Sequence, residues 1–406
     1  MSFQTGLSGL NAASKSLDVT GNNIANANTI GMKSARAEFS DLVASSLAGG
    51  GGGSSSSSGI GVSVATVSRQ FTQGNINITG NSLDVAITGG GFFQVTKTDG
   101  TTGYTRDGQF KLDKDGNLLT NTGASVMGYP TDIFGAPTSI TPTKIAVPSG
   151  APIPASPTSQ MAIECNLDAR APEAALATPP TPRTTYGTSI TAFDSQGAEV
   201  PVSLYFERVT TTGTDNWDVY DTPTGGTPLF QMQFDATGTL ISPAAAPTLT
   251  ITTPSPVTPD ISAVLDLSKI TQFGSSFNVS NSTQNGYTAG ELTGVSIAPT
   301  GGITTRYSNG QTQTLGRIVL ANFRNEQALT PIGSGEYVET FASGQPILGS
   351  PGVGKFGQVR SGALEESNVD LTAELVNMMT AQRAYQANAQ TIKTQDQVMS
   401  TLVNLR

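Results

Sequence analysis

The sequence lacks histidine altogether and has one cysteine, Cys165, among its 406 residues. Histidine is the commonest general base and metal ligand, and one cysteine cannot form an internal disulfide, so most enzyme classes and any disulfide framework are excluded. No stretch approaches the roughly 18 apolar residues of a membrane span, and no basic segment followed by an apolar run marks a cleaved secretory signal. We therefore expect no catalytic site, cofactor, metal ion, membrane insertion or cleaved signal peptide.

Charge is also scarce. Charged residues make up 13% of the chain, about half the usual share for soluble proteins. The net charge is −9 and no Lys/Arg cluster occurs, which argues against a nucleic-acid partner because binding to phosphates depends on a basic patch. A polar but weakly charged surface favours packing between neutral protein faces, since few charges lose their water when subunits meet.

The clearest positive feature of the sequence lies at the two ends of the chain, where apolar residues recur at alternating steps of three and four. Such spacing predicts coiled-coil helices. Because the two stripes match, we expect the terminal helices to pair with each other and, since much of their surface then lacks a partner within the chain, to mediate self-assembly between copies. The candidate assembly residues are Phe3, Leu7, Leu10, Leu17, Ile24, Leu371, Leu375, Met378, Tyr385, Ala389, Ile392, Met399 and Val403.

The expected N-terminal helix is weak by itself. Gly6, Gly9 and Gly21 each cost about 1 kcal/mol relative to alanine in a helix interior. We therefore hypothesise that both ends are disordered in the monomer and fold on assembly; circular dichroism showing full helix content in the monomer would contradict this. At the other end, Asn368 or Asp370 is expected to cap the long C-terminal helix.

The interior is predicted to be mainly β. Apolar residues alternate from residue 81 to 129, and Asp-Gly pairs indicate hairpin turns at residues 99–100, 107–108 and 115–116. Residues 141–183 are rich in proline and alanine with little periodicity, which indicates a boundary. A second β region follows to about residue 285, after which the first resumes, with a buried strand at 318–320.

This order predicts a mainly β, multidomain fold with nested, inserted β domains and an α-helical coiled-coil domain made from both termini. The Gly/Ser run at 49–59 is expected to be a linker or surface loop. The predicted divisions are a terminal coiled-coil domain (1–30 with 368–406), a connector region (31–80 with 357–367), a first β domain (81–145 with 286–356) and an inserted outer β domain (146–285).

Two motifs suggest ligand chemistry but fit simpler explanations better. The glycines from Gly352 to Gly357 have the spacing of a dinucleotide fingerprint, yet neither a preceding strand nor a following helix is expected there. A Gly-rich connector is the preferred interpretation. The residues from Asp113 to Asn117 are similar to a calcium loop, but the glycine stands at the wrong position and no glutamate closes the loop. A hairpin tip explains them.

The remaining candidates for chemistry have structural explanations too. Glu365 and Glu366 are adjacent, so they would not face each other on a helix, and we interpret them as favourable charge before a helix N-terminus. Arg383 and Tyr385 are residue types common in interfaces, which favours a contact role. Cys165 is expected to be a small apolar residue of the interior.

Several segments together resemble the flagellar axial proteins, and among them the hook proteins. At the N-terminus these are Ser8 to Leu10, Gly21 to Asn26 and Thr29 to Lys33, where Met32 replaces the more usual aromatic residue. At the C-terminus they are Gly362 to Leu371, Glu374 to Met378, Gln382 to Asn388 and Thr394 to Asp396. Interior segments extend the resemblance over most of the chain, including Leu83 to Gly89, Tyr104 to Phe110, Phe193 to Gly197, Leu265 to Phe273, Tyr307 to Gly310 and Leu320 to Phe323.

The resemblance implies a subunit that leaves the bacterial cell through the flagellar export apparatus and polymerises under a cap into a short curved tube. The terminal helices would line the tube and the β domains would form its outer layers. This homopolymer would act as a universal joint that passes torque from rod to filament. Its implied partners are a rod protein at the proximal end, the hook cap during growth and a hook-filament junction protein at the distal end, all in the extracellular flagellum.

Two alternatives remain open from the sequence. A distal rod protein of the same family would build a straight, stiff tube, although such proteins are typically shorter and lack the outer β domain. A secreted β-rich adhesin with a coiled-coil stalk would account for the Asp-Gly hairpins and Thr-rich strands, although adhesins normally carry a cleaved signal. An enzyme has the least support, because no pair of converging carboxylates is evident.

Overall fold

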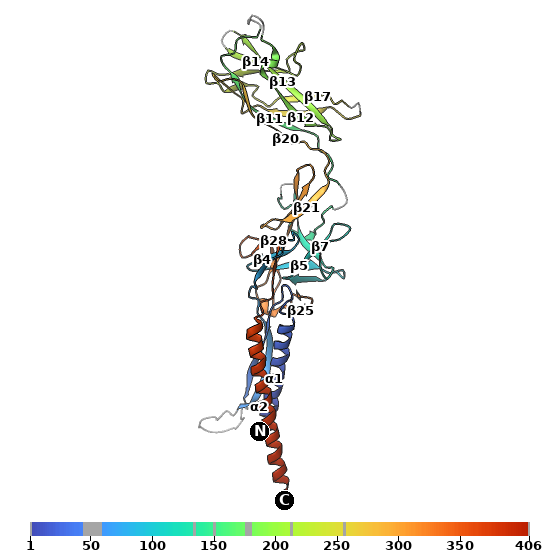
Figure 1. Cartoon of the computed structure of the whole chain (residues 1–406), viewed down its shortest axis with the longest axis vertical. Coiled ribbons are helices and arrows are strands. Elements are labelled where there is room, and N and C mark those ends of the chain that lie inside the picture. Colours follow the sequence, from blue (N-terminus) through green and yellow to red (C-terminus); the bar gives the residue numbers. More distant parts are fainter. Residues whose placement is uncertain are drawn as a thin grey trace. The chain divides into compact units, whose positions relative to one another are not determined.

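The computed structural model describes residues 2–43, 59–132, 135–148, 152–174, 181–211, 214–254 and 257–404 (Figure 1). The chain forms two compact units. Unit 1 comprises residues 1–150, 294–305 and 312–406, and unit 2 comprises 151–293 and 306–311. Unit 2 is therefore inserted into the sequence of unit 1, and the expected fold class, a nested, mainly β chain with a helix at each end, is confirmed. The finer four-part division stays a prediction, and residues 49–58 of the Gly/Ser run lie outside the described residues.

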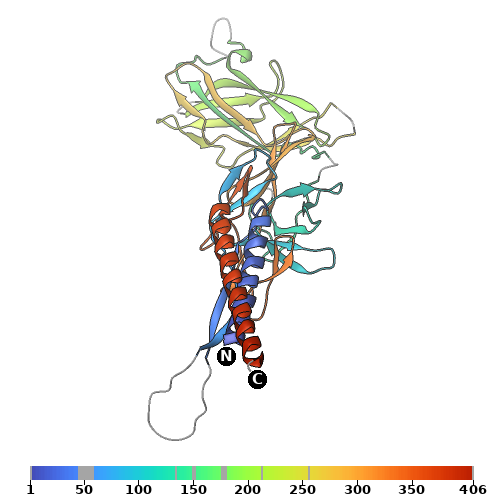
Figure 2. The same cartoon turned by 60° about the horizontal axis from the view of Figure 1, so that its bottom comes forward.

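Unit 1 contains the two terminal helices, which lie side by side in Figures 1 and 2. They are α1 (Ser2–Ala25) and α2 (Leu371–Asn404). Of the two capping residues considered, Asp370 caps α2, because its Oδ1 accepts the backbone N–H groups of Thr372 and Ala373 at 2.9 and 3.2 Å. At 1.5 Å per residue α1 is about 36 Å long and α2 about 51 Å, so α2 extends beyond its partner.

A long antiparallel hairpin packs against α1. Its strands are β1 (Ala35–Val43) and β2 (Gly59–Arg69), which pair from Ala35 opposite Arg69 to Val43 opposite Gly59 with two register shifts. The hairpin is held to α1 by the Asn23 side chain, whose Nδ2 donates to the Ala35 carbonyl at 2.8 Å while its Oδ1 accepts the Ala35 N–H at 2.9 Å. Asn23 thus completes the edge of β1 as a backbone strand would.

The β part of unit 1 is built around one large, mostly antiparallel sheet. Its main path is β21 (Leu292–Ile297), β22 (Gly302–Tyr307), β23 (Thr312–Ile318), β9 (Ser125–Pro130), β5 (Phe92–Thr96), β6 (Thr102–Thr105), β26 (Glu336–Val338) and β25 (Thr330–Gly333). Strands that join beside this path are β7 (Phe110–Leu112), β8 (Leu118–Thr120), β10 (Thr143–Lys144), β24 (Leu320–Asn322) and β27 (Ile347–Gly349). The 3₁₀ turn η2 (Glu326–Ala328) precedes β25.

Two short ladders tie the chain's C-terminal part to its N-terminal part. Strand β4 (Val85–Thr88) pairs with β28 (Gln358–Ser361), and β3 (Ile76–Ile78) pairs with β29 (Ala363–Glu365). The burial expected at 318–320 is confirmed, since Ile318, Val319 and Leu320 are fully buried, but these residues are not one strand: β23 ends at Ile318 and β24 begins at Leu320. The Gly352–Gly357 segment forms turns between β27 and β28.

The expected Asp-Gly turns are right in two of three cases. Gly100 and Gly116 have φ of 86° and 80°, and each closes a hairpin. Gly108 instead lies between two strands that do not pair with each other, and a Cβ there would lie 1.7 Å from the Val85 carbonyl oxygen. The prediction of a turn at Asp107-Gly108 is therefore wrong, because this glycine is needed for close backbone approach rather than for positive φ.

Unit 2 packs two sheets around one core. One sheet contains β11 (Gln160–Asp168), β17 (Thr248–Ile251), β18 (Ile261–Asp266), β19 (Thr271–Phe273) and β20 (Asn278–Gln284). The other contains β12 (Gly187–Phe193), β13 (Glu199–Thr211), β14 (Thr214–Tyr220), β15 (Phe230–Phe234) and β16 (Leu240–Ser242), preceded by the 3₁₀ turn η1 (Arg183–Tyr186). Both sheets contribute to the core, which includes the chain's one tryptophan, Trp217.

The division between the two units, after residue 150, falls within the predicted boundary of residues 141–183, but the same segment also contains strand β11, which the sequence interpretation missed. Met161, Ile163, Cys165 and Leu167 alternate into the core of unit 2. The alternation of apolar and polar residues from 160 to 168 is a strand signal that the sequence interpretation overlooked within a segment rich in proline and alanine. Burial raises the pKa of the Cys165 thiol to about 12, which fits the expected role of a small interior residue.

Candidate self-assembly surface

The two terminal helices run antiparallel, and α2 lies close to two glycines of α1. A Cβ on Gly6 would lie 3.2 Å from Ile392 Cγ1, and a Cβ on Gly9 would lie 2.9 Å from the Asn388 side chain. Nearer the body, Asn23 Nδ2 also donates to Glu374 Oε1 at 3.0 Å. The sequence interpretation counted these glycines only as a cost to helix stability. In the structure Gly6 and Gly9 leave room for the Ile392 and Asn388 side chains of α2.

The face of α1 that turns inward is not the predicted apolar stripe. The inward face steps through Gly6, Gly9, Ala13, Ser16, Thr20 and Asn23, all small or polar residues, of which Gly6, Ala13, Thr20 and Asn23 are buried. This stripe is offset by one residue, or about 100° around the helix, from the large one. The pairing of the two helices is confirmed, but the expectation that their matching apolar stripes meet is wrong for α1.

The large stripe of α1 consequently lies toward solvent. Phe3 and Leu7 are 50% and 44% exposed, and Leu10, Leu17 and Ile24 are half-buried. The structure therefore leaves all five candidate residues of α1 at least partly open.

The candidates on α2 divide into two groups. Met378, Ala389 and Ile392 are half-buried along the side that faces α1, whereas Leu371, Leu375, Tyr385 and Met399 are exposed. The side chain of Val403 lies outside the described residues. Sequence reasoning missed Val376 and Met379, which are about half exposed and widen the apolar surface beside Leu375. A strict heptad template could not find them, because they fall between its positions.

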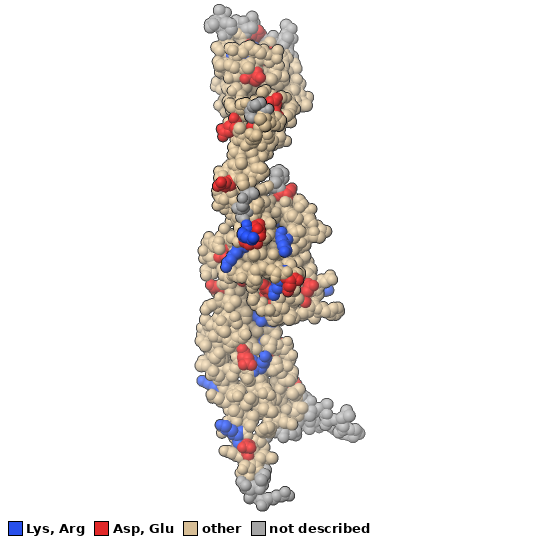
Figure 3. All heavy atoms as spheres, turned by 90° about the vertical axis from the view of Figure 1, so that its right-hand side faces the viewer, with Lys and Arg blue, Asp and Glu red and all other residues tan. Residues whose placement is uncertain are grey.

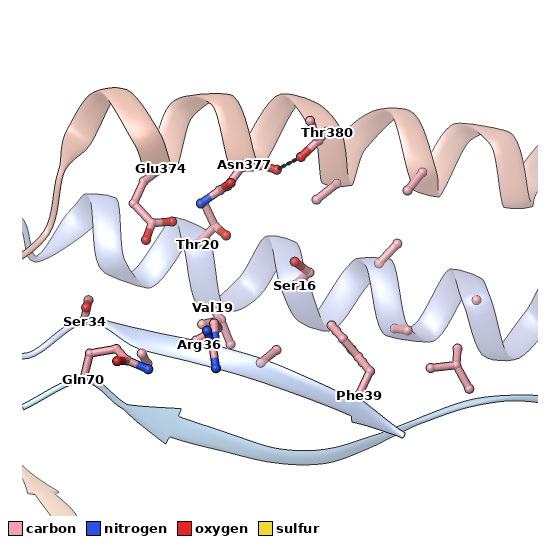
Figure 4. Close-up of a pocket in the computed structure, with 18 residues that line it drawn as sticks. Ser16, Val19, Thr20, Ser34, Arg36, Phe39, Gln70, Glu374, Asn377 and Thr380 are labelled. Atoms are coloured by element: carbon pink, nitrogen blue, oxygen red, sulfur yellow. Dashed lines mark hydrogen bonds between the residues drawn. The ribbon is translucent and has the colours of Figure 1, made fainter. Parts of the chain in front are cut away.

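A groove of about 750 Å³ lies between α1, α2 and the β1–β2 hairpin (Figure 4). Figure 4 shows Ser16, Val19 and Thr20 on α1, Asn377 and Thr380 on α2, and Phe39 on β1 around it. Many of the side chains that line the groove are small: Gly9, Ala12, Ala13, Ala35, Ala37, Ala381 and Ala384. Sequence reasoning missed this groove, because it depends on a hairpin whose packing against the helices has no sequence signal.

The other candidates for chemistry become structural elements. Asp113 Oδ1 accepts the backbone N–H groups of Asp115 and Asn117 at 2.9 and 2.7 Å, as in an ordinary hairpin tip. Arg383 is exposed on α2. Glu365 corrects the sequence interpretation: it lies on β29, fully buried, in contact with Lys33 and Arg106, and does not serve the helix N-terminus.

The residues that the structure describes include no group of three or more His, Cys, Asp or Glu side chains arranged to hold a metal ion. Neither α1 nor α2 has the length and apolarity, in its described part, to cross a membrane. On the face drawn in Figure 3, charged side chains are scattered and the two signs intermingle.

The chain matches known flagellar protein families and, over its full length, known flagellar hook proteins. Residues 3–33 match the family described as flagella basal body rod protein, 86–164 the flagellar hook protein FlgE/F/G D1 domain, 166–287 the flagellar basal body protein FlaE D2 domain, and 360–405 the flagellar basal body rod FlgEFG protein C-terminal. Over its full length the chain is 41% identical to the flagellar hook protein FlgE of Escherichia coli K12 and 39% identical to that of Salmonella typhimurium LT2, each covered completely. The chain belongs to the flagellar hook protein family.

The fold agrees with this membership. A crystal structure of the Helicobacter pylori flagellar hook protein FlgE2 superposes with a TM-score of 0.54 at 15% identity, covering 71% of this chain and all of that one. As a hook protein the chain is a structural subunit of the flagellar hook, in a polymeric assembly with other flagellar components. The distal rod and adhesin alternatives are not favoured.

Proposed function

We propose that this hook protein polymerises through its terminal helices into a curved tube that acts as a universal joint and passes torque from rod to filament. The observation that supports this most directly is the division of α1 into two stripes. The small stripe is used within the chain, and the large stripe is left partly open by the described residues.

The open stripes are large enough to stabilise contacts between copies. Full burial of a large apolar side chain contributes about 1.5–3 kcal/mol, so a side chain already half-buried would contribute roughly 1 kcal/mol more. Phe3 and Leu7 on α1 and Leu375 and Met379 on α2 are all in this state. Because a subunit in a tube contacts several neighbours, such increments add up over the lattice.

A helical tube requires two different surfaces on each subunit that fit each other, since a contact between identical surfaces closes into a dimer. Unit 1 offers such a pair. The groove floored by glycine and alanine has room for large side chains, and the exposed face of α2 carries Leu371, Leu375 and Met379. We infer that the large face of one copy enters the groove of the next, as knobs enter holes in a coiled coil.

The register of the helices adds a further contact. With Gly6 near Ile392 and Gly9 near Asn388, the N-terminus of α1 comes opposite about residue 396 of α2. Figure 1 shows the C-terminal end of α2 continuing past the N-terminus of α1. This overhang includes the half-exposed Val398 and Met399, and we propose that it binds a neighbouring copy.

A matched pair of substitutions on α2 tests the groove. Ala384 and Ala387 are both exposed, but only Ala384 is among the residues that line the groove. Ala384→Leu should fill the groove and raise the concentration needed for polymerisation by about 10- to 100-fold, the equivalent of 1–3 kcal/mol of overpacking. Ala387→Leu should change it by less than about threefold. Equal effects of the two variants would contradict the assignment of the groove to a second copy.

Electron microscopy after polymerisation in concentrated precipitating salt tests the universal joint itself. Curved tubes would place the bending in the subunit, and straight, stiff tubes would contradict a flexible joint. Persistent monomer, both alone and with the cap protein added, would contradict self-assembly.

The remaining assignments are proposals that follow the family. We propose that residues 1–30 with 368–406 line the inner tube, 31–80 with 357–367 connect them to the first β domain (81–145 with 286–356), and 146–285 form the outer layer. Weakly charged outer faces would slide past one another without breaking deep charge pairs as the tube rotates. We further propose export without a cleaved signal, and contacts with the rod protein, the hook cap, the hook-filament junction protein and the export apparatus.

A further inference from the structure

Three charged side chains from distant parts of the sequence meet in the interior of unit 1. Glu365 accepts a hydrogen bond from Lys33 Nζ to its Oε1 at 2.6 Å and another from Arg106 Nη1 to its Oε2 at 3.0 Å. The side chains of Lys33 and Glu365 are fully buried and that of Arg106 is 4% exposed. Buried charges are costly unless they are paired, so this cluster is under strong physical constraint.

Each member of the cluster belongs to a different structural element. Lys33 lies in the connector between α1 and β1, Glu365 ends β29 just before the connector to α2, and Arg106 follows β6 in the large sheet. The Arg106 guanidinium also stacks over the Phe92 ring at 5.3 Å and donates from Nη2 to the Gly89 carbonyl at 2.9 Å. The cluster therefore joins both helix connectors to the aromatic core of the sheet.

Backbone contacts around the cluster join the same segments. The Gly31 N–H donates to the Glu365 carbonyl at 2.8 Å, and the Ser34 N–H donates to Asn368 Oδ1 at 2.7 Å. Asn368 in turn donates to the Gln70 carbonyl at 2.7 Å, which explains why this residue does not cap α2. The N-terminal connector is thus bonded directly to the C-terminal one.

The charges are unequal, since two cations share one carboxylate. Removing the carboxylate would leave two buried positive groups facing a neutral side chain. This should destabilise the fold far more than removing either cation, which would leave the carboxylate paired with the other. A packing role alone would not produce this asymmetry. Neutralising Glu365 should therefore be severe, and removing a cation afterwards should relieve the damage.

We propose that Lys33, Arg106 and Glu365 form an ionic latch that locks the two helix connectors to the β body, so that the folded part of the monomer extends outward to residues 33 and 368 whether or not the helices are formed. The latch closes only when Glu365, 332 residues after Lys33, reaches its place. Folding of the connectors must then wait for the C-terminal end of the chain. This inference does not depend on what the helices bind.

Trypsin provides a direct readout on the full-length chain, because cleavage after Lys33 requires the buried side chain to leave the latch. Glu365→Gln should accelerate cleavage of the bond between Lys33 and Ser34 by on the order of 100-fold or more. Glu366→Gln is the matched control. It removes the same charge from the neighbouring, half-buried residue and should change the rate by less than about threefold.

The decisive variant carries Arg106→Met together with Glu365→Gln. It should be cleaved after Lys33 more slowly than Glu365→Gln alone, although it carries one more substitution. If Glu365→Gln prevents folding, the double variant should restore a chain resistant at Lys33. The proposal is overturned if the Glu365 and Glu366 variants behave alike, or if Arg106→Met adds to the loss or fails to restore resistance.

Discussion

The turn that leads from α1 into the hairpin depends on Gly31. Its φ is 69°, and a Cβ there would lie 2.6 Å from the Arg106 carbonyl carbon and 2.7 Å from the Asp107 nitrogen. These are backbone atoms that no side-chain rotation can move. In Gly31→Ala the left-handed conformation should cost about 1–2 kcal/mol. The turn must then also be strained or move away from the Arg106–Asp107 backbone, at a further cost of about 1–3 kcal/mol. We expect unit 1 to lose about 2–5 kcal/mol.

Gly80 is the matched control, because its φ of 77° is similar but a Cβ there would have nothing within 4 Å. Gly80→Ala therefore isolates the conformational term, and the 1–3 kcal/mol difference between the two variants measures the close approach. Calorimetry would follow both units, and fluorescence of Trp217, buried in the core of unit 2, would identify that unit's transition. Equal losses in the two variants, or a shift of the Trp217 transition in Gly31→Ala, would refute this reasoning.

Three further predictions concern single side chains. Asp370→Ala should remove the cap of α2 and cost about 1 kcal/mol, seen as faster amide hydrogen exchange in its first turn; unchanged exchange would count against the cap. Because burial raises its pKa to about 12, the Cys165 thiol should be inert to thiol reagents at pH 8 until unit 2 unfolds, and rapid labelling of the native chain would contradict its burial. Burial lowers the pKa of Lys33 from 10.5, although the hydrogen bond that Lys33 donates to Glu365 acts in the opposite direction. Between that lowered pKa and 10.5 the unfolded chain therefore binds more protons than the folded one. The free energy of unfolding of unit 1 should therefore rise with pH in this window relative to that of Lys33→Met, a comparison in which the tyrosine contributions cancel. A difference that does not rise at any pH below 10.5 would contradict the lowered pKa of Lys33.

Much of the fold could be predicted from local sequence patterns. Apolar spacing at both ends predicted two helices that pair, and alternation predicted most of the β regions, because both signals depend on neighbours within a few residues. The Asp370 cap and the turns at Gly100 and Gly116 followed from the same short-range chemistry. The strand β11 was overlooked although its residues alternate, because it lies in a segment rich in proline and alanine and pairs with strands about 100 residues later.

The candidate self-assembly surface could be predicted only in part from the sequence. Periodicity shows that a helix has stripes, but not which stripe a neighbour will cover. On α1 the stripe of small residues faces α2, because glycine and alanine let two helix backbones approach each other more closely than leucine would. The larger stripe was thereby left for contacts outside the chain.

Glu365 shows the same limit most clearly. In the sequence it is one of two adjacent glutamates before a helix, and nothing nearby distinguishes it from Glu366. Its partners Lys33 and Arg106 stand 332 and 259 residues away, and only the tertiary packing of unit 1 brings them within hydrogen-bonding distance. Composition and periodicity determined the fold class, a mainly β chain with a helix at each end, since they act through local conformation and burial. Which charges meet in its interior was decided by long-range packing, because desolvation makes a buried charge depend on every segment that surrounds it.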